Sequence, residues 1–245
     1  MQRQRQDATL AIVIPAFNEE EVLARTLADC AQVFADDSRL REIIVVDDAS
    51  TDGTARIVEQ HAAGDERIRL ERNPTCVGCV PTVLRGFGLA ESEFSFFLPA
   101  DGQITADVAR ACLDKAEAGY DVVLTRRVSR QDPAHRIWMS RAYNWLVRRV
   151  LPGFPAADID SSCLFRTALA TSIDVRSPGA FGLVELVHAA QRSGARIVEI
   201  EIEHHPRQGG RAHGLRSREI VDAAKGLTRM VDIRRRHGSA HSGAR

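Results

Sequence analysis

The sequence of 245 residues has no long hydrophobic run and no net charge. A membrane-spanning helix needs about 20 consecutive apolar residues, and no stretch approaches that length. The 33 Lys and Arg residues balance the 33 Asp and Glu residues, so no overall field attracts nucleic acid or an acidic membrane. We therefore expect neither a membrane-spanning protein nor a nucleic acid partner.

Cysteine is scarce as well, and the five cysteines are scattered along the chain. Small secreted domains pair their cysteines in disulfides, so an odd and scattered set favours a reducing cytoplasm. The polar N-terminus MQRQRQDATL lacks the apolar segment of a secretory signal peptide. We expect a cytoplasmic protein in which residues 1–9 form a flexible N-terminus.

The rest of the chain is organised around residues 42–54, which read EIIVVDDASTDGT. The fully apolar, β-branched run Ile43–Val46 is typical of a strand buried on both faces of a parallel sheet. Asp47 and Asp48 follow at its carboxyl end, where open α/β sheets bind ligands. These carboxylates either accept hydrogen bonds from a ribose or a base, or cap the helix that begins at Thr54.

Apolar strands that alternate with amphipathic helices predict an α/β fold with a doubly wound, mostly parallel sheet in a single domain. The predicted strands are residues 10–14, 43–46, 67–70, 94–98, 121–125, 162–165 and 196–202. The predicted helices are residues 54–61, 80–90, 105–118, 134–150, 181–193 and 217–236. A further helix is expected to begin at Asn18, in a capping box with Glu21.

Three motifs together resemble glycosyltransferase family 2. They are AIVIPAFNEEEVL, then EIIVVDDASTDGT, then the acidic loop PADGQ after the strand at 94–98. The branch that they most resemble is the polyprenyl-phosphate (dolichyl-phosphate) mannosyl- and glucosyltransferases. The resemblance runs from about residue 10 to 214. Further matches in that range are Gly78, Gly86, Arg127 and Asn144.

The resemblance implies a GT-A (Rossmann-like) fold and an inverting transfer from a UDP- or GDP-sugar. It places a glycosyltransferase domain at residues 10–215, with a nucleotide-sugar half at 10–128 and an acceptor half at 129–215. Residues 216–245 would form a C-terminal amphipathic helix and a flexible tail. The donor-binding residues that it implies are Pro15, Phe17, Asn18 and Glu19 around the base and ribose, with Asp47, Asp48 and Gln103.

The acidic loop departs from the family pattern, because Pro99 stands where the first carboxylate of a D-x-D motif is expected. Asp101, the second carboxylate, would hold Mg²⁺ or Mn²⁺ together with donor phosphates, since hard cations prefer oxygen ligands. The cation would stabilise the leaving diphosphate as a Lewis acid. Arg127, Arg207 and Arg211 are candidates to share that task, although each can equally be a solvated surface charge.

The acceptor decides whether the reaction needs a base. A polyprenyl phosphate, which the branch resemblance implies, is already an anionic nucleophile at neutral pH. A soluble small-molecule hydroxyl is the alternative acceptor, and it needs a general base, for which Asp158, Asp160 and Glu185 are candidates. Glu185 can instead form a structural ion pair. An alternative of another class is a non-catalytic nucleotide-sugar-binding protein, because Pro99 replaces a metal ligand.

Three further patterns each have two interpretations. The C-x-x-C at residues 76–79 suits a redox pair, but we favour two small residues that flank a required Gly. The aromatic residues at 138–145 can face a lipid or a sugar, but a helical aromatic stripe is more often core. The helix at 217–236 can lie at the inner face of the membrane or, as we favour, pack on the domain. The oligomeric state stays open.

Overall fold

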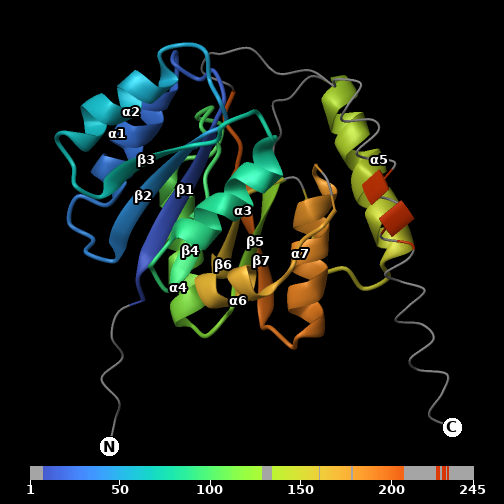
Figure 1. The fold of residues 1–245 in the computed structure, drawn as a ribbon. Coiled ribbons are helices and arrows are strands. Elements are labelled where there is room, and N and C mark those ends of the chain that lie inside the picture. The colour runs from blue at the N-terminus through green and yellow to red at the C-terminus, as the bar shows by residue number, and fades with distance from the viewer. Residues whose placement is uncertain are drawn as a thin grey trace, which may run out of the picture.

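A seven-stranded, mostly parallel sheet forms the centre of the computed structural model (Figure 1). The structure describes residues 8–128, 134–159, 161–177 and 179–206, with residues 225–226, 228–229 and 231 near the C-terminus. The strands lie in the order β3-β2-β1-β4-β6-β5-β7. Their bounds are β1 Leu10–Ala16, β2 Leu40–Asp47, β3 Ile68–Arg72, β4 Phe94–Phe97, β5 Val122–Val128, β6 Cys163–Arg166 and β7 Ile197–Glu203.

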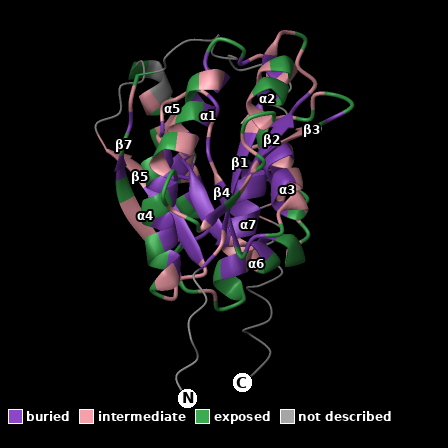
Figure 2. Cartoon of the chain, turned by 90° about the vertical axis from the view of Figure 1, so that its left-hand side faces the viewer, coloured by how far each residue is buried: buried purple, intermediate pink, exposed green. Residues whose placement is uncertain are grey.

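The central strands are buried on both faces because their side chains alternate between two apolar clusters. Ile12 and Ile14 of β1 join one cluster, whereas Ala11 and Val13 join the other. In β2 the run Ile43–Val46 is fully buried, as its uninterrupted apolar sequence predicts. Figure 2 shows this buried interior continuing from the sheet onto the inner sides of the helices.

Helices cover both faces of the sheet, which confirms the predicted α/β architecture. On one face lie α1, α2 and α4, and on the other lie α3, α5, α6 and α7. Their bounds are α1 Leu23–Val33, α2 Thr54–Ala62, α3 Cys79–Leu89, α4 Ala106–Glu117, α5 Ala134–Val150, α6 Thr167–Ser172 and α7 Phe181–Arg192. Among the described residues, no helix combines the length and the apolar character needed to cross a bilayer.

The direction of β6 is not apparent from the sequence. It lies between β4 and β5 and runs antiparallel to both, with Phe165 opposite Ser95 and Leu164 opposite Val123. The six-residue helix α6 follows directly and was not predicted, because so short a segment carries too little helical periodicity. The chain therefore runs through β6 in the direction opposite to β4 and β5, and α6 follows before α7 begins.

The predicted capping box at Asn18 is wrong. α1 begins at Leu23, and its N-cap residue makes no side-chain capping hydrogen bond. Asn18 instead has a positive φ of 55°, which Asn tolerates better than most residues. Its Oδ1 accepts a hydrogen bond from the backbone N–H of Thr51 at 2.8 Å, so it ties the loop after β1 to the loop after β2.

The prediction that the aromatic residues of the 134–150 helix form core holds for only one of them. Tyr143 packs edge-on against Phe181 with a ring separation of 5.2 Å. In contrast, Trp138 and Trp145 are 69% and 64% exposed. Most of the helix predicted at 217–236 lies outside the described residues.

Candidate active site

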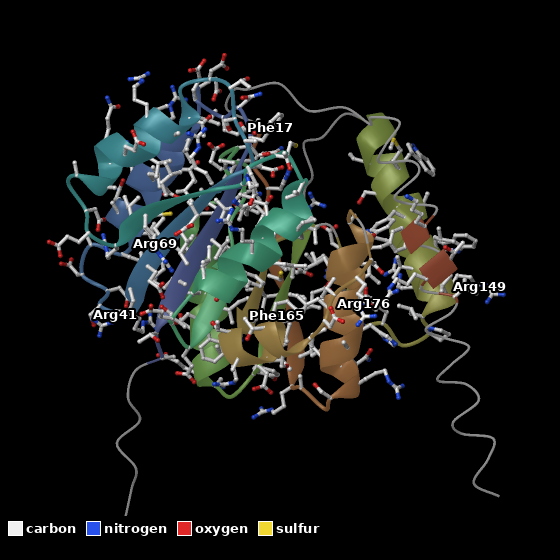
Figure 3. The ribbon with its side chains drawn as sticks, in the orientation of Figure 1. Phe17, Arg41, Arg69, Arg149, Phe165 and Arg176 are labelled. Atoms are coloured by element: carbon white, nitrogen blue, oxygen red, sulfur yellow. The ribbon has the colours of Figure 1, made fainter. Side chains whose placement is uncertain are left out.

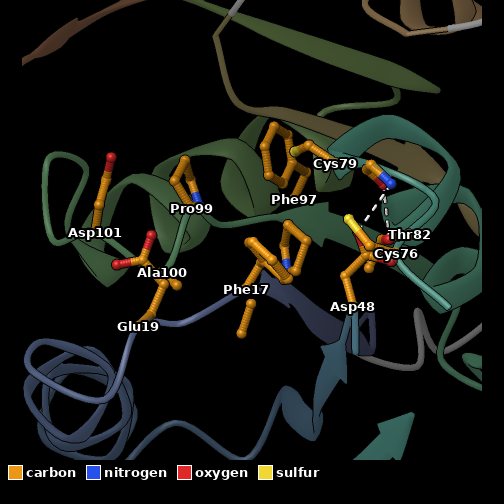
Figure 4. A pocket seen from close by; sticks show the side chains of 13 residues that line it. Phe17, Glu19, Asp48, Cys76, Cys79, Thr82, Phe97, Pro99, Ala100 and Asp101 are labelled. Atoms are coloured by element: carbon orange, nitrogen blue, oxygen red, sulfur yellow. Dashed lines mark hydrogen bonds between the residues drawn. The ribbon is translucent and has the colours of Figure 1, made fainter. Parts of the chain in front are cut away.

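A pocket of about 330 Å³ lies at the carboxyl ends of β1, β2 and β4. Pro15, Phe17, Glu19, Asp48 and Asp101, which the sequence singles out, all line it. Figure 4 shows Asp48 at one end of the pocket, and Glu19 and Asp101 at the other. The remaining lining residues are Ala16, Cys76, Gly78, Cys79, Thr82, Phe97, Pro99 and Ala100.

Asp48 is held by hydrogen bonds to both of its carboxylate oxygens. Oδ1 accepts the amide of Asn73 at 2.8 Å and the backbone N–H of Val77 at 2.9 Å. Oδ2 accepts the backbone N–H of Gly78 at 2.8 Å and the thiol of Cys76 at 3.2 Å. A carboxylate has about four lone-pair sites, so a base or ribose that binds Asp48 must displace one of these donors. The thiol is the weakest of them.

The charge of Asp48 is maintained by its surroundings although the residue is only 3% exposed. Burial alone would raise the pKa of this carboxyl. The hydrogen bonds from Val77, Asn73 and Gly78 outweigh burial and hold the pKa below its ordinary value. The ionised carboxylate of Asp48 therefore holds the 76–78 loop in place along the pocket wall.

Asp47 and Asn18 do not line the pocket but support its walls. Asp47 is fully buried, and its carboxylate accepts the backbone N–H of Ser50 at 2.9 Å and Nε of Arg72 at 3.0 Å. The backbone N–H of Asn18 donates to the hydroxyl of Ser50 at 2.9 Å. The neighbouring Glu19 N–H donates to the hydroxyl of Thr54 at 2.9 Å. These contacts join the loops after β1 and β2 beneath the site.

The loop that follows β4 places Asp101 at the rim of the pocket. Thr26 on α1 donates its hydroxyl proton to the carbonyl of Ala100 at 2.9 Å. Asp101 Oδ1 accepts the backbone N–H of Gln103 at 3.1 Å. The carbonyl of Gln103 in turn accepts the backbone N–H of His205 at 3.0 Å. Gln103 thus fastens the chain beyond β7 to the acidic loop, although it does not line the pocket.

The pocket offers oxygen ligands of the kind that a hard divalent cation prefers. The carboxylates of Asp101 and Glu19 lie at the same end of it (Figure 4). Mg²⁺ usually binds through one or two carboxylates and completes its shell with substrate phosphates and water. The described residues contain no preformed group of three His, Cys, Asp or Glu ligands. This donor set fits a cation that binds together with a diphosphate better than one held by protein alone.

Arg127 forms a buried ion pair with Asp158. Nε and Nη2 of Arg127 lie 2.7 and 2.9 Å from the two oxygens of Asp158. The two side chains are only 10% and 7% exposed, and neither residue lines the pocket. The buried side chain of Asn144 accepts the backbone N–H of Ile159 at 3.1 Å. Arg127, Asp158 and Asn144 thereby join β5 and α5 to the segment before β6.

Glu185 forms the structural ion pair that the sequence left open as an alternative. Its Oε2 accepts the backbone N–H groups of Arg176 at 3.0 Å and Ser177 at 2.6 Å. Its Oε1 lies 3.2 Å from Nη2 of Arg229. Burial opposes ionisation, but the hydrogen bonds from Arg229 and Ser177 lower the pKa of Glu185 below its ordinary value. Asp160, Arg207 and Arg211 lie outside the described residues.

Comparison with a family model shows to which family the chain belongs. The model described as glycosyl transferase family 2 matches residues 11–170, which run from the second residue of β1 past the end of β6 and include the whole pocket. The chain belongs to glycosyl transferase family 2. Its sheet and helices form the GT-A fold of that family, as the sequence motifs indicated.

Two curated relatives are undecaprenyl-phosphate 4-deoxy-4-formamido-L-arabinose transferases. The one from Pseudomonas fluorescens SBW25 is 35% identical over 173 residues, 67% of this chain and 48% of its own length. The one from Proteus mirabilis is 30% identical over 209 residues, 82% of this chain and 61% of its own length. The chain thus spans about half to three fifths of the length of these relatives.

Solved structures of the same fold include glucosyl-3-phosphoglycerate synthase from Mycobacterium tuberculosis. Its complex with Mn²⁺, UDP-glucose and phosphoglyceric acid superposes with a TM-score of 0.71 at 18% identity, over 91% of this chain and 80% of that one. Its complex with Mg²⁺ and UDP has a TM-score of 0.65 at 18% identity, over 93% and 78% of the two chains. At this level of identity the likeness concerns the fold.

Some residues that line or support the pocket are not apparent from the sequence, among them Phe97 in the lining and Asn73 behind it. Asn73 binds Asp48 and also donates to the hydroxyl of Thr82 at 3.1 Å. The dipeptide Asn73-Pro74 is a turn signal, but nothing in it points to Asp48. Phe97 contributes apolar surface beside Pro99. Only the folded chain brings these residues together.

Proposed function

We propose that this chain transfers a sugar, with inversion, from a UDP- or GDP-sugar to a polyprenyl phosphate, assisted by Mg²⁺ or Mn²⁺ at Asp101. The proposal rests on one observation above others: Asp48 and Asp101, from two different strand ends, line one pocket of a family 2 glycosyltransferase fold. The curated relatives named for transfer to undecaprenyl phosphate favour the lipid acceptor. The UDP-glucose and Mn²⁺ bound to the structural neighbour favour the donor and the cation.

In this proposal the two ends of the pocket have different tasks. Phe17 and Pro15 flank the base of the donor. Asp48 holds the 76–78 loop, which packs on the other side of the base. Asp101, with Glu19 at the same end of the pocket, would hold the cation beside the donor diphosphate. A bound cation supplies Lewis-acid stabilisation of the leaving diphosphate. Because a phosphate acceptor is already anionic, this mechanism needs no general base.

The ion pairs of Glu185 and Asp158 agree with a mechanism without a base. Glu185 accepts hydrogen bonds from two backbone N–H groups and pairs with the guanidinium of Arg229. Asp158 accepts hydrogen bonds from Nε and Nη2 of Arg127. A transfer to a soluble hydroxyl needs a carboxylate or imidazole that faces the acceptor. The soluble acceptor therefore remains the second candidate.

We also propose peripheral contact with the membrane through α5, which carries exposed aromatic residues. The sequence of α5, AHRIWMSRAYNWLVRRV, contains Arg residues and no Asp or Glu. Trp138, Met139 and Trp145 are exposed on it, and the guanidinium carbon of Arg141 lies 5.9 Å from the ring centre of Trp138. Arg149 projects outward from the same helix (Figure 3). Exposed Trp with basic neighbours suits the interface of an anionic bilayer.

The decisive experiment measures transfer of labelled sugar from UDP- and GDP-sugars to polyprenyl phosphate, with and without Mn²⁺. We expect organic-extractable product that depends on Mn²⁺ and is lost in Asp101→Asn. The matched control is Asp107→Asn, an exposed carboxylate on α4 outside the pocket, which should retain transfer. Exclusively water-soluble product would favour the soluble acceptor. Nucleotide binding without any transfer or hydrolysis would favour the non-catalytic binding protein.

A further inference from the structure

The five thiols of this chain fall into two chemical classes. Cys30, Cys112 and Cys163 are buried in the core. Burial raises the pKa of Cys30 and of Cys163 to about 12, and raises the pKa of Cys112 well above its ordinary value. Because the thiolate is the reactive form, these three are protected from thiol reagents.

The other two thiols, Cys76 and Cys79, both line the candidate donor pocket (Figure 4). Cys79 is exposed, and Cys76 is partly exposed. The two cysteines that reagents in solution can reach therefore both lie in the site proposed to bind the nucleotide-sugar. This selectivity follows from the fold, since the sequence alone does not separate the five cysteines.

The two pocket thiols differ in their electrostatic surroundings. Cys79 is the first residue of the 11-residue helix α3, where backbone N–H groups and the helix dipole favour a negative charge. Cys76 donates its thiol proton to the Asp48 carboxylate at 3.2 Å, and that neighbouring negative charge disfavours a second one. Cys79 is accordingly placed as the attacking thiol of the pair, and Cys76, which is hydrogen-bonded to Asp48, is placed as the resolving thiol.

We propose that Cys79 is a thiol-modification site, which forms a mixed disulfide with low-molecular-weight disulfides such as oxidised glutathione and thereby closes the donor pocket. This proposal rests on the proposed function only in taking the pocket as the donor site. The Cys79 thiolate attacks one sulfur of the disulfide, the S–S bond breaks, and one glutathione leaves as a thiolate that takes a proton from water. Oxidised glutathione is the oxidant: one of its sulfurs is reduced, and the other stays bound to Cys79.

Closure follows from the size and lining of the pocket. A glutathionyl group on Cys79 is a tripeptide placed inside a pocket of about 330 Å³, where it competes directly with a nucleotide. If Cys76 then displaces the glutathione, a Cys76–Cys79 disulfide forms and the thiol hydrogen bond to Asp48 is lost. Both products, the mixed disulfide and the Cys76–Cys79 disulfide, begin with attack by Cys79. In both of them the pocket no longer has the reduced thiols that it has in this structure.

The test treats the folded protein with oxidised glutathione, locates the modification by peptide mass mapping, and measures UDP and GDP affinity by calorimetry before and after. We expect modification that begins at Cys79, a loss of nucleotide affinity of more than about tenfold, and recovery with a reductant. In Cys79→Ser, oxidised glutathione should leave the affinity where it was. In Cys76→Ser, the glutathionyl group should persist on Cys79, because the resolving thiol is absent.

Two results would overturn the proposal. One is a reactivity of Cys79 no greater than that of Cys30, Cys112 and Cys163. The other is a fully modified Cys79 with unchanged nucleotide affinity. A reduced protein that binds neither UDP nor GDP contradicts the proposed function and, with it, closure of a donor site. In that case the mass map still decides whether Cys79 is the reactive thiol, so the two failures are distinguishable.

Discussion

The carboxylate of Asp48 accepts the backbone N–H of Gly78 at one end of the pocket, with Oδ2 and N 2.8 Å apart. Gly78 can present its N–H in this direction because it has a positive φ of 100° and stands immediately before α3. The contact joins the end of β2 to the start of α3. The same carboxylate therefore shapes the pocket and orients the helix whose first residue is Cys79.

Gly78→Ala should weaken this junction although there is room for a methyl group. No atom lies within 4 Å of a Cβ built at Gly78, so the cost comes from the left-handed backbone, at about 1–2 kcal/mol of unfolding free energy. Gly88→Ala is the matched control: it lies within α3, it too has no neighbour within 4 Å, and it should stabilise by about 0.5–1 kcal/mol. Urea denaturation measures both. Equal effects at the two positions would contradict the role of the backbone conformation.

Asp48→Asn should reduce stability at neutral pH and lose that effect in acid. The pKa of Asp48 is lower in the folded chain than in the unfolded chain, so the ionised residue stabilises the fold above about pH 4. That contribution falls as the pH drops through the folded pKa. Asn also turns an N–H₂ group toward N–H donors, and we expect a loss of about 1–3 kcal/mol at pH 7. Denaturation from pH 7 to pH 3, with the exposed Asp36→Asn as the control, tests this dependence.

Arg127→Ala should be strongly destabilising, because it breaks the bidentate ion pair between Arg127 and the buried Asp158. Breaking a buried ion pair in this way costs about 3–5 kcal/mol. Arg176→Ala is the control, since Arg176 and Asp174 are 67% and 68% exposed and water screens such a surface pair, so we expect little change in stability. Thermal and urea unfolding compare the two variants. If Arg127 binds a phosphate instead of holding Asp158, Arg127→Ala will lower donor affinity while leaving stability nearly unchanged.

Glu185→Gln separates a structural carboxylate from a catalytic base. The amide retains the shape but loses the charge that binds Arg229 and the backbone of residues 176–177, so we expect about 1.5–3 kcal/mol less stability. Transfer measured under folding conditions should keep its pH profile and most of its kcat. Loss of a general base would instead lower kcat by about 10²–10⁴-fold and remove the acidic limb of the profile. The second result would favour a hydroxyl acceptor.

Replacing Trp138 and Trp145 together by Ala should weaken binding to anionic lipid vesicles. Burying a large apolar side chain contributes roughly 1.5–3 kcal/mol, so we expect at least about a tenfold loss in vesicle sedimentation. Stability should change by less than about 0.5 kcal/mol per site, because both rings are exposed. Neutral vesicles and high salt should weaken binding of the unmodified protein through the Arg residues of α5. Undiminished vesicle binding by the variant would remove α5 as the contact surface.

Much of the fold was predictable because it depends on local periodicity. The helix predicted at 134–150 is α5 to the residue, and the predicted strands at 10–14 and 43–46 lie within β1 and β2. The antiparallel direction of β6 was not predictable, since it depends on pairing with β4 and β5 and not on any pattern within four residues. Trp138 and Trp145 show a related limit, because helical spacing does not reveal which face meets the core.

The amino-acid order is enough to predict which chemical groups stand at the strand ends. Apolar runs must be buried, so the polar residues that follow them, such as Asp48 and Asp101, collect at one edge of a parallel sheet. The contacts that those groups make appear only in the folded chain. Asp48 meets Asn73, Cys76 and Gly78, and Glu185 meets Arg229. Hydrogen-bond partners and burial depend on contacts between segments distant in the chain, and burial distinguishes the two pocket thiols from the three core thiols that share their chemistry.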